Sequence, residues 1–363
     1  MSEPLFSLVM CIHGVEDYVY AAVTSLLEQD FKDFELILID DKTADRSMLR
    51  ALRAAGSDER VRIIHNKENL GLPASRNRGI DAARGRYIAF PDAEDTALPG
   101  YLSAAANAIK TTNSDIVVEG VTEDFFNRRG DISYSKRHVP ESARFPSKQT
   151  DGMGIFKDDN RAHVVQFLET YDLMHHVYTK FFKSELIGET RFETKQHYSE
   201  DFFFTLEMFE RAQSICVLAN TFYVYKRHLR RQKQLSLTKG TFIERHRRIA
   251  ASQLHQEENN IDTLASRQFL GALYMRYIMA ELARMQDPAA HKTKEERQKW
   301  FAFLHEDPLF DLLVTQTSPD KHVTPRLYHA LLTSGWKAGA FWVARAVAFL
   351  KSFGPGNYAR TQE

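Results

Sequence analysis

The chain has few cysteines, no excess of charge of either sign and no long apolar run. Its two cysteines, Cys11 and Cys216, are too few for a disulfide scaffold, and neither has a partner at metal-ligand spacing. Lysine plus arginine and aspartate plus glutamate number 48 each, which argues against a nucleic-acid binder held by net positive charge. We therefore expect both cysteines to be reduced core residues. Any anion that the protein binds must be bound by positive groups close to its site, because the chain carries no net positive charge.

Neither a signal peptide nor a membrane-spanning helix is predicted. The N-terminus, Met-Ser-Glu-Pro-Leu-Phe, lacks the basic start and apolar run of a signal peptide. No stretch is apolar for long enough to cross a bilayer. These absences predict a cytoplasmic protein, which can still touch the inner face of the cell membrane.

Strand and helix patterns alternate through the first part of the chain. Strands are expected at 6–12, 34–39, 61–65 and 86–90, with helices at 19–29, 46–55 and 74–83. Single helices between apolar strands predict an α/β fold with a mostly parallel sheet covered on both faces. Ligands bind beyond the carboxyl ends of such strands. Polar clusters follow all four strands, at residues 13–14, 40–41, 66–76 and 92–95.

The fourth strand runs directly into three carboxylates, Asp92, Glu94 and Asp95. Carboxylates gathered at a sheet edge repel one another unless a cation lies between them, and their oxygen atoms suit Mg²⁺ or Mn²⁺. The structural alternative is a turn in which Asp92 caps a helix that begins near Pro99. A divalent-metal site at this edge is therefore a hypothesis.

A series of short motifs resembles the family 2 glycosyltransferases of GT-A fold, which is a Rossmann-like fold. The matching segments, in chain order, are Glu16-x-Tyr18, Ser25-Leu26-Leu27-x-Gln29, the run from Asp33 to Asp41, Asn69-x-Gly71, Arg76-Asn77-x-Gly79, Gly85-x-Tyr87-Ile88, Asp92-x-Glu94-Asp95, Thr179-Lys180-Phe181-Phe182, Glu200-Asp201 and Tyr223-x-Tyr225-Lys226-x-His228. The resemblance ends near Thr238.

The resemblance implies an inverting, metal-dependent transfer of a hexosyl or N-acetylhexosaminyl group. The donor is expected to be a nucleotide-diphosphate sugar, by family habit a UDP-sugar, and the cofactor Mn²⁺ or Mg²⁺. The acceptor is expected to be a hydroxyl of a glycan or a lipid-linked glycan in bacterial surface polysaccharide or capsule synthesis. Nucleic acid is not an expected partner.

The same resemblance assigns roles to the acidic residues. Glu94 is expected to ligate the metal directly, and Asp92 to contact the ribose or assist at the metal. Because glutamate replaces the family's aspartate at Glu94, part of the ligation can shift to Asp95. Asp201 matches the catalytic base and Glu200 an acceptor-binding residue, since a base must stand apart from the metal cluster. The alternative is that Glu200 and Asp201 only cap the helix expected over 202–209.

Three further residues are expected to bind the nucleotide. Asp41 matches the position that accepts a hydrogen bond from the uracil ring in relatives, and its alternative role is to cap the following helix. His13 stands where relatives often carry a tyrosine that packs on the base. Arg76 lies near the start of a helix at the carboxyl edge, which favours anions, although a surface ion pair explains it equally well.

Basic residues are the candidates for contact with the diphosphate. Lys226 and His228 lie in a cationic segment, and Lys180 lies in an expected strand at 178–182. Fixed positive charge stabilises a departing diphosphate. A solvated loop or a patch for anionic lipid is the alternative. Between Asp124 and Asp159 the pattern is polar and irregular, which predicts a loop over the acceptor groove.

The length of 363 residues exceeds that of a single usual core. We expect a GT-A domain over 1–240 and a helical domain over 241–363. The GT-A domain would have a nucleotide-binding half at 1–120 and an acceptor-binding half at 121–240. The last helical stretch, Trp336–Leu350, has a wide apolar face that suits core packing, a membrane surface or a second subunit in a homodimer.

Two other functions compete with sugar transfer. A nucleotidyltransferase would also use paired acids on an α/β sheet, but it should carry a glycine-rich loop after the first strand, where this chain has Gly14 alone. A catalytically inactive nucleotide-binding scaffold is the second alternative. The joint presence of Asp41, Asp92, Glu94 and Asp201 argues against it.

Overall fold

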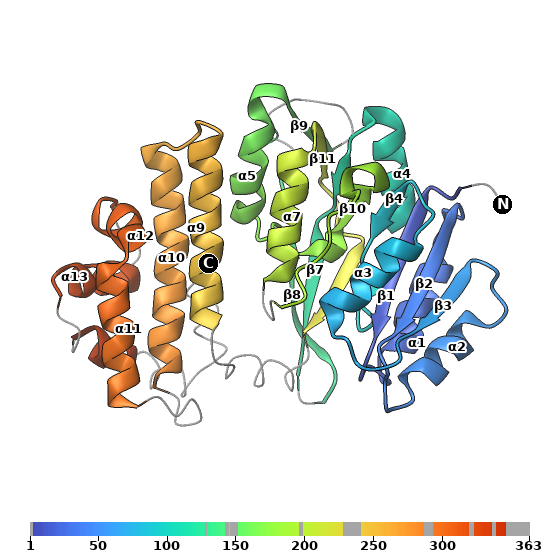
Figure 1. Ribbon diagram of the computed structural model, residues 1–363, viewed down its shortest axis with the longest axis horizontal. Helices are drawn as coiled ribbons and strands as arrows, with labels where there is room; N and C mark the ends of the chain where they lie inside the picture. Colours follow the sequence, from blue (N-terminus) through green and yellow to red (C-terminus); the bar gives the residue numbers. More distant parts are fainter. Residues whose placement is uncertain are drawn as a thin grey trace. The chain divides into compact units, whose positions relative to one another are not determined.

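The computed structural model of the chain divides into two compact units, Met1–Leu229 and Arg230–Glu363 (Figure 1). Our expected boundary at residue 240 and the observed one both fall in residues 228–240, which lie outside the described residues. The structure describes residues 3–127, 129–141, 145, 152–195, 199–227, 241–286, 293–318, 323–335 and 339–345.

The first unit is built on a mixed sheet of eight strands in the order β3-β2-β1-β4-β10-β6-β11-β9. Neighbours within β3-β2-β1-β4 are parallel, as are β6 and β11, whereas β10 is antiparallel to β4 and β6 and β9 is antiparallel to β11. The strands are β1 (Phe6–Ile12), β2 (Phe34–Asp40), β3 (Val61–His65), β4 (Tyr87–Ala89), β6 (Ile116–Val118), β9 (Met153–Lys157), β10 (Lys180–Lys183) and β11 (Ser214–Leu218).

Helices alternate with the first four strands, as the sequence predicts. These helices are α1 (Val19–Leu27), α2 (Ser47–Ala55), α3 (Leu72–Ala82) and, after β4, α4 (Tyr101–Thr112). β1 and β2 are buried along nearly their whole length, which is typical of parallel strands covered on both faces. α3 packs directly on β1 at Gly79, where an added Cβ atom would lie 2.1 Å from Cγ1 of Val9. α3 and β1 therefore need glycine at this crossing.

A second sheet of four strands has the order β5-β12-β7-β8. Its strands are β5 (Thr96–Ala97), β7 (Val121–Phe126), β8 (Ile132–His138) and β12 (Tyr223–Arg227). The expectation of an irregular loop over 124–159 is wrong within the described residues, because β8 and β9 lie there. β8 is exposed at all but its last residue, so it pairs with β7 without showing the apolar alternation that predicts a strand.

The remaining elements of this unit lie between strands β9, β10 and β11 of the eight-stranded sheet. They are η2 (Asp158–His163), α5 (Val164–Thr170), η3 (Val177–Thr179), α6 (Ser184–Ile187) and α7 (Glu200–Arg211). The strand expected at 178–182 begins only at Lys180, because residues 177–179 form a 3₁₀ turn. Cys216 is buried, Cys11 is half-buried, and neither forms a disulfide.

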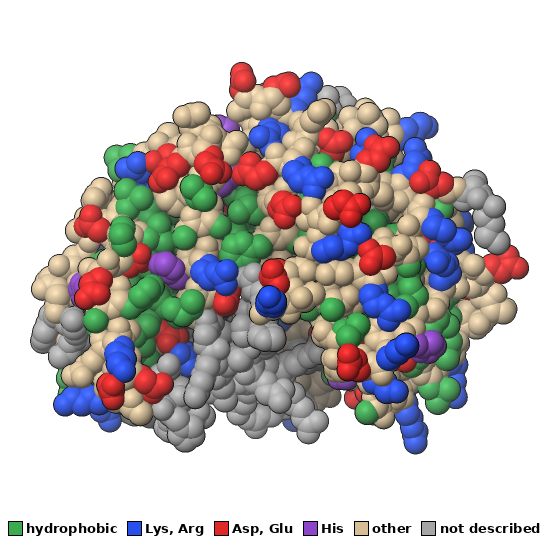
Figure 2. Space-filling view, viewed as in Figure 1, with side chains coloured by type: hydrophobic (Ala, Val, Ile, Leu, Met, Phe, Trp, Pro, Cys, Tyr) green, Lys and Arg blue, Asp and Glu red, His purple; other side chains and the backbone are tan. Residues whose placement is uncertain are grey.

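The surface mixes charges of both signs. Figure 2 shows lysine and arginine side chains interspersed with aspartate and glutamate over the face in view. This distribution agrees with the equal totals of the two kinds of residue. None of the described helices combines the length and the low polarity that crossing a membrane requires.

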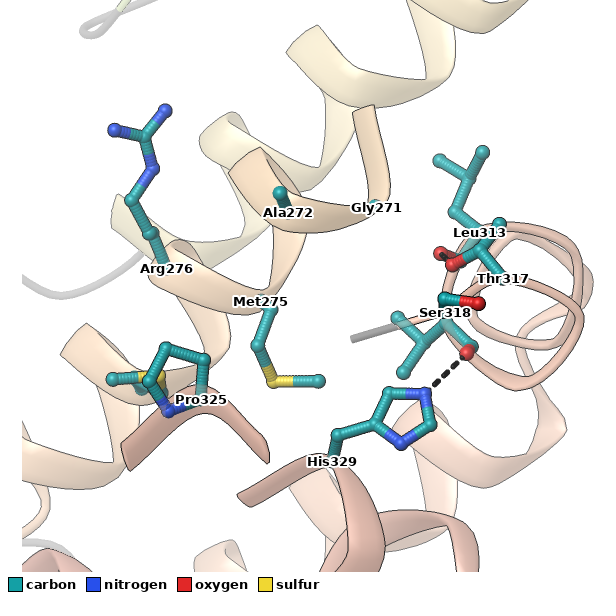
Figure 3. Close-up of a pocket in the computed structure, with 11 residues that line it drawn as sticks. Gly271, Ala272, Met275, Arg276, Leu313, Thr317, Ser318, Pro325 and His329 are labelled. Atoms are coloured by element: carbon teal, nitrogen blue, oxygen red, sulfur yellow. Dashed lines mark hydrogen bonds between the residues drawn. The ribbon is translucent and has the colours of Figure 1, made fainter. Parts of the chain in front are cut away.

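The second unit is helical and has its own apolar core. Its helices are α9 (Thr241–Glu258), α10 (Leu264–Arg284), α11 (Lys294–Glu306), α12 (Pro308–Phe310), the π-helix η5 (Asp311–Thr315) and α13 (Val323–Thr333). Tyr274, Leu282 and Leu313 lie in the core, and so do Ala340 and Ala344 of the helical segment 339–345. A small pocket opens between α10, η5 and α13, beside Met275 and His329 (Figure 3).

Candidate active site

A buried arginine joins the two acidic clusters that the sequence singles out. Arg76 lies in α3 with a side chain that is only 2% exposed. Its Nη2 lies 3.3 Å from Oδ1 of Asp92, and its Nη1 pairs with Oδ1 of Asp201 and lies 3.8 Å from Oε1 of Glu200. A buried guanidinium needs such compensation, because an unpaired charge is costly away from water. The turn after β4 and the start of α7 therefore converge on one point.

The start of α7 holds Glu200 and Asp201 in its first turn. Negative charge is favourable there because the N-terminal end of a helix carries partial positive charge. Burial and the neighbouring Asp201 raise the pKa of Glu200 to about 7, against the lowering effect of Arg76. The Asp201 carboxylate pairs with Arg76 of α3. Asp201 therefore does more than cap its own helix.

Asp92 and Glu94, both half-buried, lie in the turn that follows β4. The backbone N–H of Asp92 donates to Oη of Tyr223 at 2.9 Å, which ties this turn to β12. Asp92 does not cap the next helix, because α4 begins at Tyr101 with Gly100 at its N-cap. The two carboxylates offer the oxygen atoms that Mg²⁺ and Mn²⁺ prefer.

Asp95 is buried beneath this turn and bonded through both of its oxygens. Tyr223 donates its hydroxyl to Oδ2 at 3.0 Å, and the backbone N–H of Lys226 donates to Oδ1 at 2.9 Å. Burial and the neighbouring Asp92 raise the pKa of Asp95 well above its ordinary value. Asp95 therefore fastens the acidic turn to β12. Tyr223, which holds Asp95 and Asp92 together, entered the sequence analysis only as part of a motif.

Asp41 organises the loop before α3. Its Oδ1 accepts from Nδ2 of Asn66 and from the backbone N–H of Leu70, both at 2.8 Å, and its Oδ2 accepts from the N–H of Gly71 at 3.0 Å. The alternative role as a cap of the following helix is therefore wrong, because these bonds lead to the loop and not to α2. Gly71 has φ of 82°, a conformation that favours glycine.

His13 lies on the exposed side of Asp41. Its Nδ1 is 3.0 Å from the carbonyl oxygen of Asp41, and its Nε2 is 3.2 Å from Nδ2 of Asn69. These contacts fit a neutral imidazole whose Nδ1–H donates to the carbonyl and whose Nε2 accepts from the amide. His13, Asp41 and Asn69 thus form one rim at the carboxyl edge of the sheet.

The basic candidates occupy different environments. Lys180 is fully buried, and its Nζ donates to the carbonyl oxygens of Leu173 and His176 at 2.7 and 2.8 Å. Burial lowers the pKa of Lys180 to about 7. Lys226 is half-buried; burial also lowers its pKa, while Asp95 acts in the opposite direction. His228 lies outside the described residues.

These features define a class of protein, the open α/β sheets, and the candidate ligand site lies where such proteins bind ligands, beyond the carboxyl ends of the parallel strands. Residues 7–164 match the model of glycosyl transferase family 2. Over this segment the chain resembles glycosyltransferase family 2, and its fold is GT-A.

Curated relatives resemble the chain over part of its length. The uncharacterized glycosyltransferase EpsJ of Bacillus subtilis (strain 168) is 30% identical over 228 residues, which cover 61% of each chain. The putative teichuronic acid biosynthesis glycosyltransferase TuaG of the same strain is 32% identical over 93 residues, covering 26% of this chain and 37% of TuaG.

Among solved structures, S. aureus TarS 1-349 in complex with UDP-GlcNAc has a TM-score of 0.62 at 17% identity. The match covers 94% of this chain and 91% of that one. It concerns the fold alone. The chain spans less than two thirds of the length of the first curated relatives that it matches, with 61% and 62% covered.

Proposed function

We propose that the protein is an inverting glycosyltransferase that moves a sugar from a nucleotide-diphosphate donor to a hydroxyl group. The observation that carries this proposal is the pairing of Arg76 with both Asp92 and Asp201. It brings a donor-side carboxylate and a candidate base to the same guanidinium. The match of residues 7–164 to the glycosyl transferase family 2 model supports the reaction class.

The donor is proposed to be a UDP-sugar carrying a hexosyl or N-acetylhexosaminyl group. TarS, which shares the fold, was solved with UDP-GlcNAc. For the acceptor we propose a glycan or lipid-linked glycan of a bacterial surface polysaccharide, because TuaG is described as a teichuronic acid glycosyltransferase. Residues 1–120 would form the nucleotide-binding half, and the rest of the first unit the acceptor-binding half.

The nucleotide is proposed to bind at the rim of His13 and Asp41. A carboxylate has about four acceptor positions, and the bonds to Asn66, Leu70 and Gly71 use three of those on Asp41. One position remains for a ring N–H of the base. His13, anchored through Nδ1, can lay its imidazole against the base.

A divalent cation, Mg²⁺ or Mn²⁺, is proposed to bind Glu94 with the help of Asp92. The oxygen donors fit such an ion, and Glu94 is the main ligand in this proposal because it stands at an aspartate position of the family's Asp-x-Asp motif. When bound, the ion acts as a Lewis acid on the diphosphate. Asp95 supports this turn from below through Tyr223.

Positive charge from Arg76 and Lys226 would complement the donor diphosphate. Lys180 would have to give up its bonds to Leu173 and His176 to reach a phosphate, so we favour Lys226 for that contact. His228 keeps the same role as a prediction from the sequence.

Asp201 is proposed to be the general base. The acceptor hydroxyl oxygen forms a bond to the anomeric carbon, its proton passes to a carboxylate oxygen of Asp201, and the nucleoside diphosphate leaves with the electron pair of the broken bond. Glu200 lies beside Asp201, and its pKa is raised to about 7. It can orient the acceptor by hydrogen bonding in either protonation state.

The decisive experiment replaces Asp201 and follows sugar transfer and donor binding separately. Asp201→Asn should lower transfer by about 10²- to 10⁴-fold, the usual contribution of a general base, while donor affinity stays within about twofold. The control is Asp81→Asn, which removes an exposed carboxylate also paired with an arginine, Arg191. Turnover by Asp201→Asn equal to that of the control would remove Asp201 from the mechanism.

A further inference from the structure

Three histidines and an aspartate that belong to neither acidic cluster gather in the first unit. One ligand atom from each of Asp172, His175 and His176 lies within 4.8 Å of the other two. Nδ1 of His175 is 3.6 Å from Oδ1 of Asp172, and Nδ1 of His138 is 3.7 Å from Oδ2. Asp172, His175 and His176 belong to the segment between α5 and η3, whereas His138 is the last residue of β8.

In His138 and His176, one ring nitrogen is held by a neighbouring polar group, and the second nitrogen is left for another contact. Nε2 of His138 is 3.0 Å from Oε2 of Glu123, so its Nδ1 is turned toward Asp172. Nδ1 of His176 is 2.7 Å from Oη of Tyr178, which leaves Nε2 as the nitrogen for a further ligand. Histidines that bind metals commonly have the second nitrogen oriented in this way by a carboxylate or another polar group.

We propose that Asp172, His175 and His176 form a binding site for a divalent transition metal ion of the Zn²⁺ type, with His138 beside Asp172. Imidazole nitrogen with one carboxylate oxygen suits Zn²⁺ better than Mg²⁺. Bonds of about 2.0 to 2.2 Å in tetrahedral geometry place ligand atoms about 3.3 to 3.6 Å apart. The carboxylate-to-imidazole distances at Asp172 are close to these values.

The surrounding charges are compatible with a bound cation. Arg227 pairs with Glu123, and Lys180 directs its ammonium group to the carbonyl oxygens of Leu173 and His176. Asp172, whose side chain is 55% exposed, gives the ion access to solvent. The site is separate from the one proposed at Glu94, and its donor set is nitrogen-rich where that one is all oxygen.

A metal here would brace the segment that leads into the candidate active site. It would hold together the segment 172–176, whose carbonyl groups at Leu173 and His176 accept from Lys180 and whose Asp172 lies beside His138 of β8. That segment continues to Tyr178, and the Tyr178 ring stacks on Tyr223 with centroids 4.7 Å apart. Tyr223 in turn donates to Asp95. The ion would therefore stabilise the packing beneath the acidic turn without touching the donor.

The test is a titration of the tag-free full chain with Zn²⁺ after treatment with a chelator, using calorimetry and metal analysis. Asp172→Asn and His175→Gln should weaken Zn²⁺ binding by at least about tenfold, because even outer partners of metal ligands are worth 10- to 100-fold. Asp172 has φ of 58°, a conformation that asparagine tolerates, so this variant should keep the backbone. Co²⁺ absorption provides a spectroscopic measure of the nitrogen ligands.

Two control variants make the result specific. His163→Gln alters an exposed histidine outside the cluster, and Glu94→Gln alters the proposed donor-metal site. Both should bind one Zn²⁺ per chain as tightly as the parent protein. Unchanged binding in Asp172→Asn and His175→Gln, no stoichiometric binding by the parent, or loss of binding in Glu94→Gln alone would each overturn the proposal. Loss of sugar transfer in Glu94→Gln with Zn²⁺ binding intact would support it.

Discussion

Arg76 shows how one side chain can serve both stability and function. Its charge lies inside the protein, and it is compensated by Asp92, Glu200 and Asp201. Neither acidic cluster is adjacent to Arg76 in the sequence, so the pairing depends entirely on the way α3, the turn after β4 and α7 pack. A surface arginine in an ion pair would contribute much less, because water already screens its charge.

Replacement of Arg76 should be strongly destabilising. Arg76→Met leaves three partly buried carboxylates without their shared counter-charge, and a loss of about 3 to 5 kcal/mol in the free energy of unfolding is expected. Arg191→Met, which breaks an exposed pair with Asp81, should cost less than about 1 kcal/mol. Urea denaturation measures both. A loss for Arg76→Met no larger than that for Arg191→Met would mean that the buried pairs contribute no net stability.

Glu200 should make stability depend on pH. Its pKa rises from the ordinary 4.5 to about 7 in the folded state, so the folded protein binds this proton more tightly than the unfolded chain does. The corresponding stability is complete below about pH 4.5 and is lost as the pH rises through 7. Glu200→Gln, which is neutral throughout, should therefore gain stability relative to the parent between pH 5 and pH 8.

Denaturation series at intervals across that range measure the difference. Glu207→Gln, on the same helix but 54% exposed, is the matched control and should run parallel to the parent. A Glu200→Gln curve that also runs parallel to the parent would show that Glu200 titrates as an ordinary glutamate.

The sequence predicts the candidate residues better than it predicts their surroundings. Asp92, Asp201 and Arg76 stand out by type and position, and the structure brings them together. The burial of Asp95 and Lys180 was not predicted, because it depends on Tyr223 and on the carbonyl groups of residues 173 and 176. The cluster around Asp172 was overlooked too, although the doublet His175-His176 near an aspartate is a signal in the sequence.

At the level of elements, prediction succeeds where burial is complete. β1 and β2 are buried and largely apolar, with Ser7 and Glu35 as buried polar exceptions, and their predicted positions are confirmed to within one residue. β8 was missed because backbone pairing with β7, rather than an apolar face, holds it in place. A strand that buries little side-chain surface leaves little trace in the hydrophobic pattern.

The apolar stripe near the C-terminus can serve either core packing or membrane binding, and the residues of segment 339–345 allow the two roles to be tested. Ala340 and Ala344 are fully buried, whereas Trp342 is 65% exposed. Ala344→Asp should therefore destabilise the helical unit by several kcal/mol, because it buries an unpaired charge (roughly 3 or more). Trp342→Ser should leave the melting temperature almost unchanged.

Binding to anionic vesicles, measured by sedimentation, tests the other role of the stripe. If Trp342→Ser releases the protein from vesicles without a change in stability, the exposed side of this segment binds lipid. Unaltered stability in Ala344→Asp would show that the face carrying Ala340 and Ala344 does not belong to the core.

At the scale of the whole molecule, the donor and the metal should act as stabilising ligands of the first unit. A ligand that binds only the folded state at about 100 times its Kd adds about 2.7 kcal/mol to the free energy of unfolding. UDP-sugar with Mn²⁺ should therefore raise the melting temperature, and chelation of Mn²⁺ should remove most of the increase. Because Glu94 is the proposed main ligand, Glu94→Gln should lose the metal-dependent part and keep the part that the nucleotide alone provides.

Glu185→Gln is the matched control for that experiment, since Glu185 is an exposed glutamate of the same unit with a side chain that is 83% accessible. It should respond to donor and Mn²⁺ as the parent does. A panel of nucleotide sugars measured in this way also ranks the bases, because His13 and Asp41 are the groups proposed to contact them. Equal metal-dependent stabilisation of Glu94→Gln and Glu185→Gln would place the cation on residues other than Glu94. If the donor stabilises every variant to the same extent with and without Mn²⁺, the chain binds its donor without a metal.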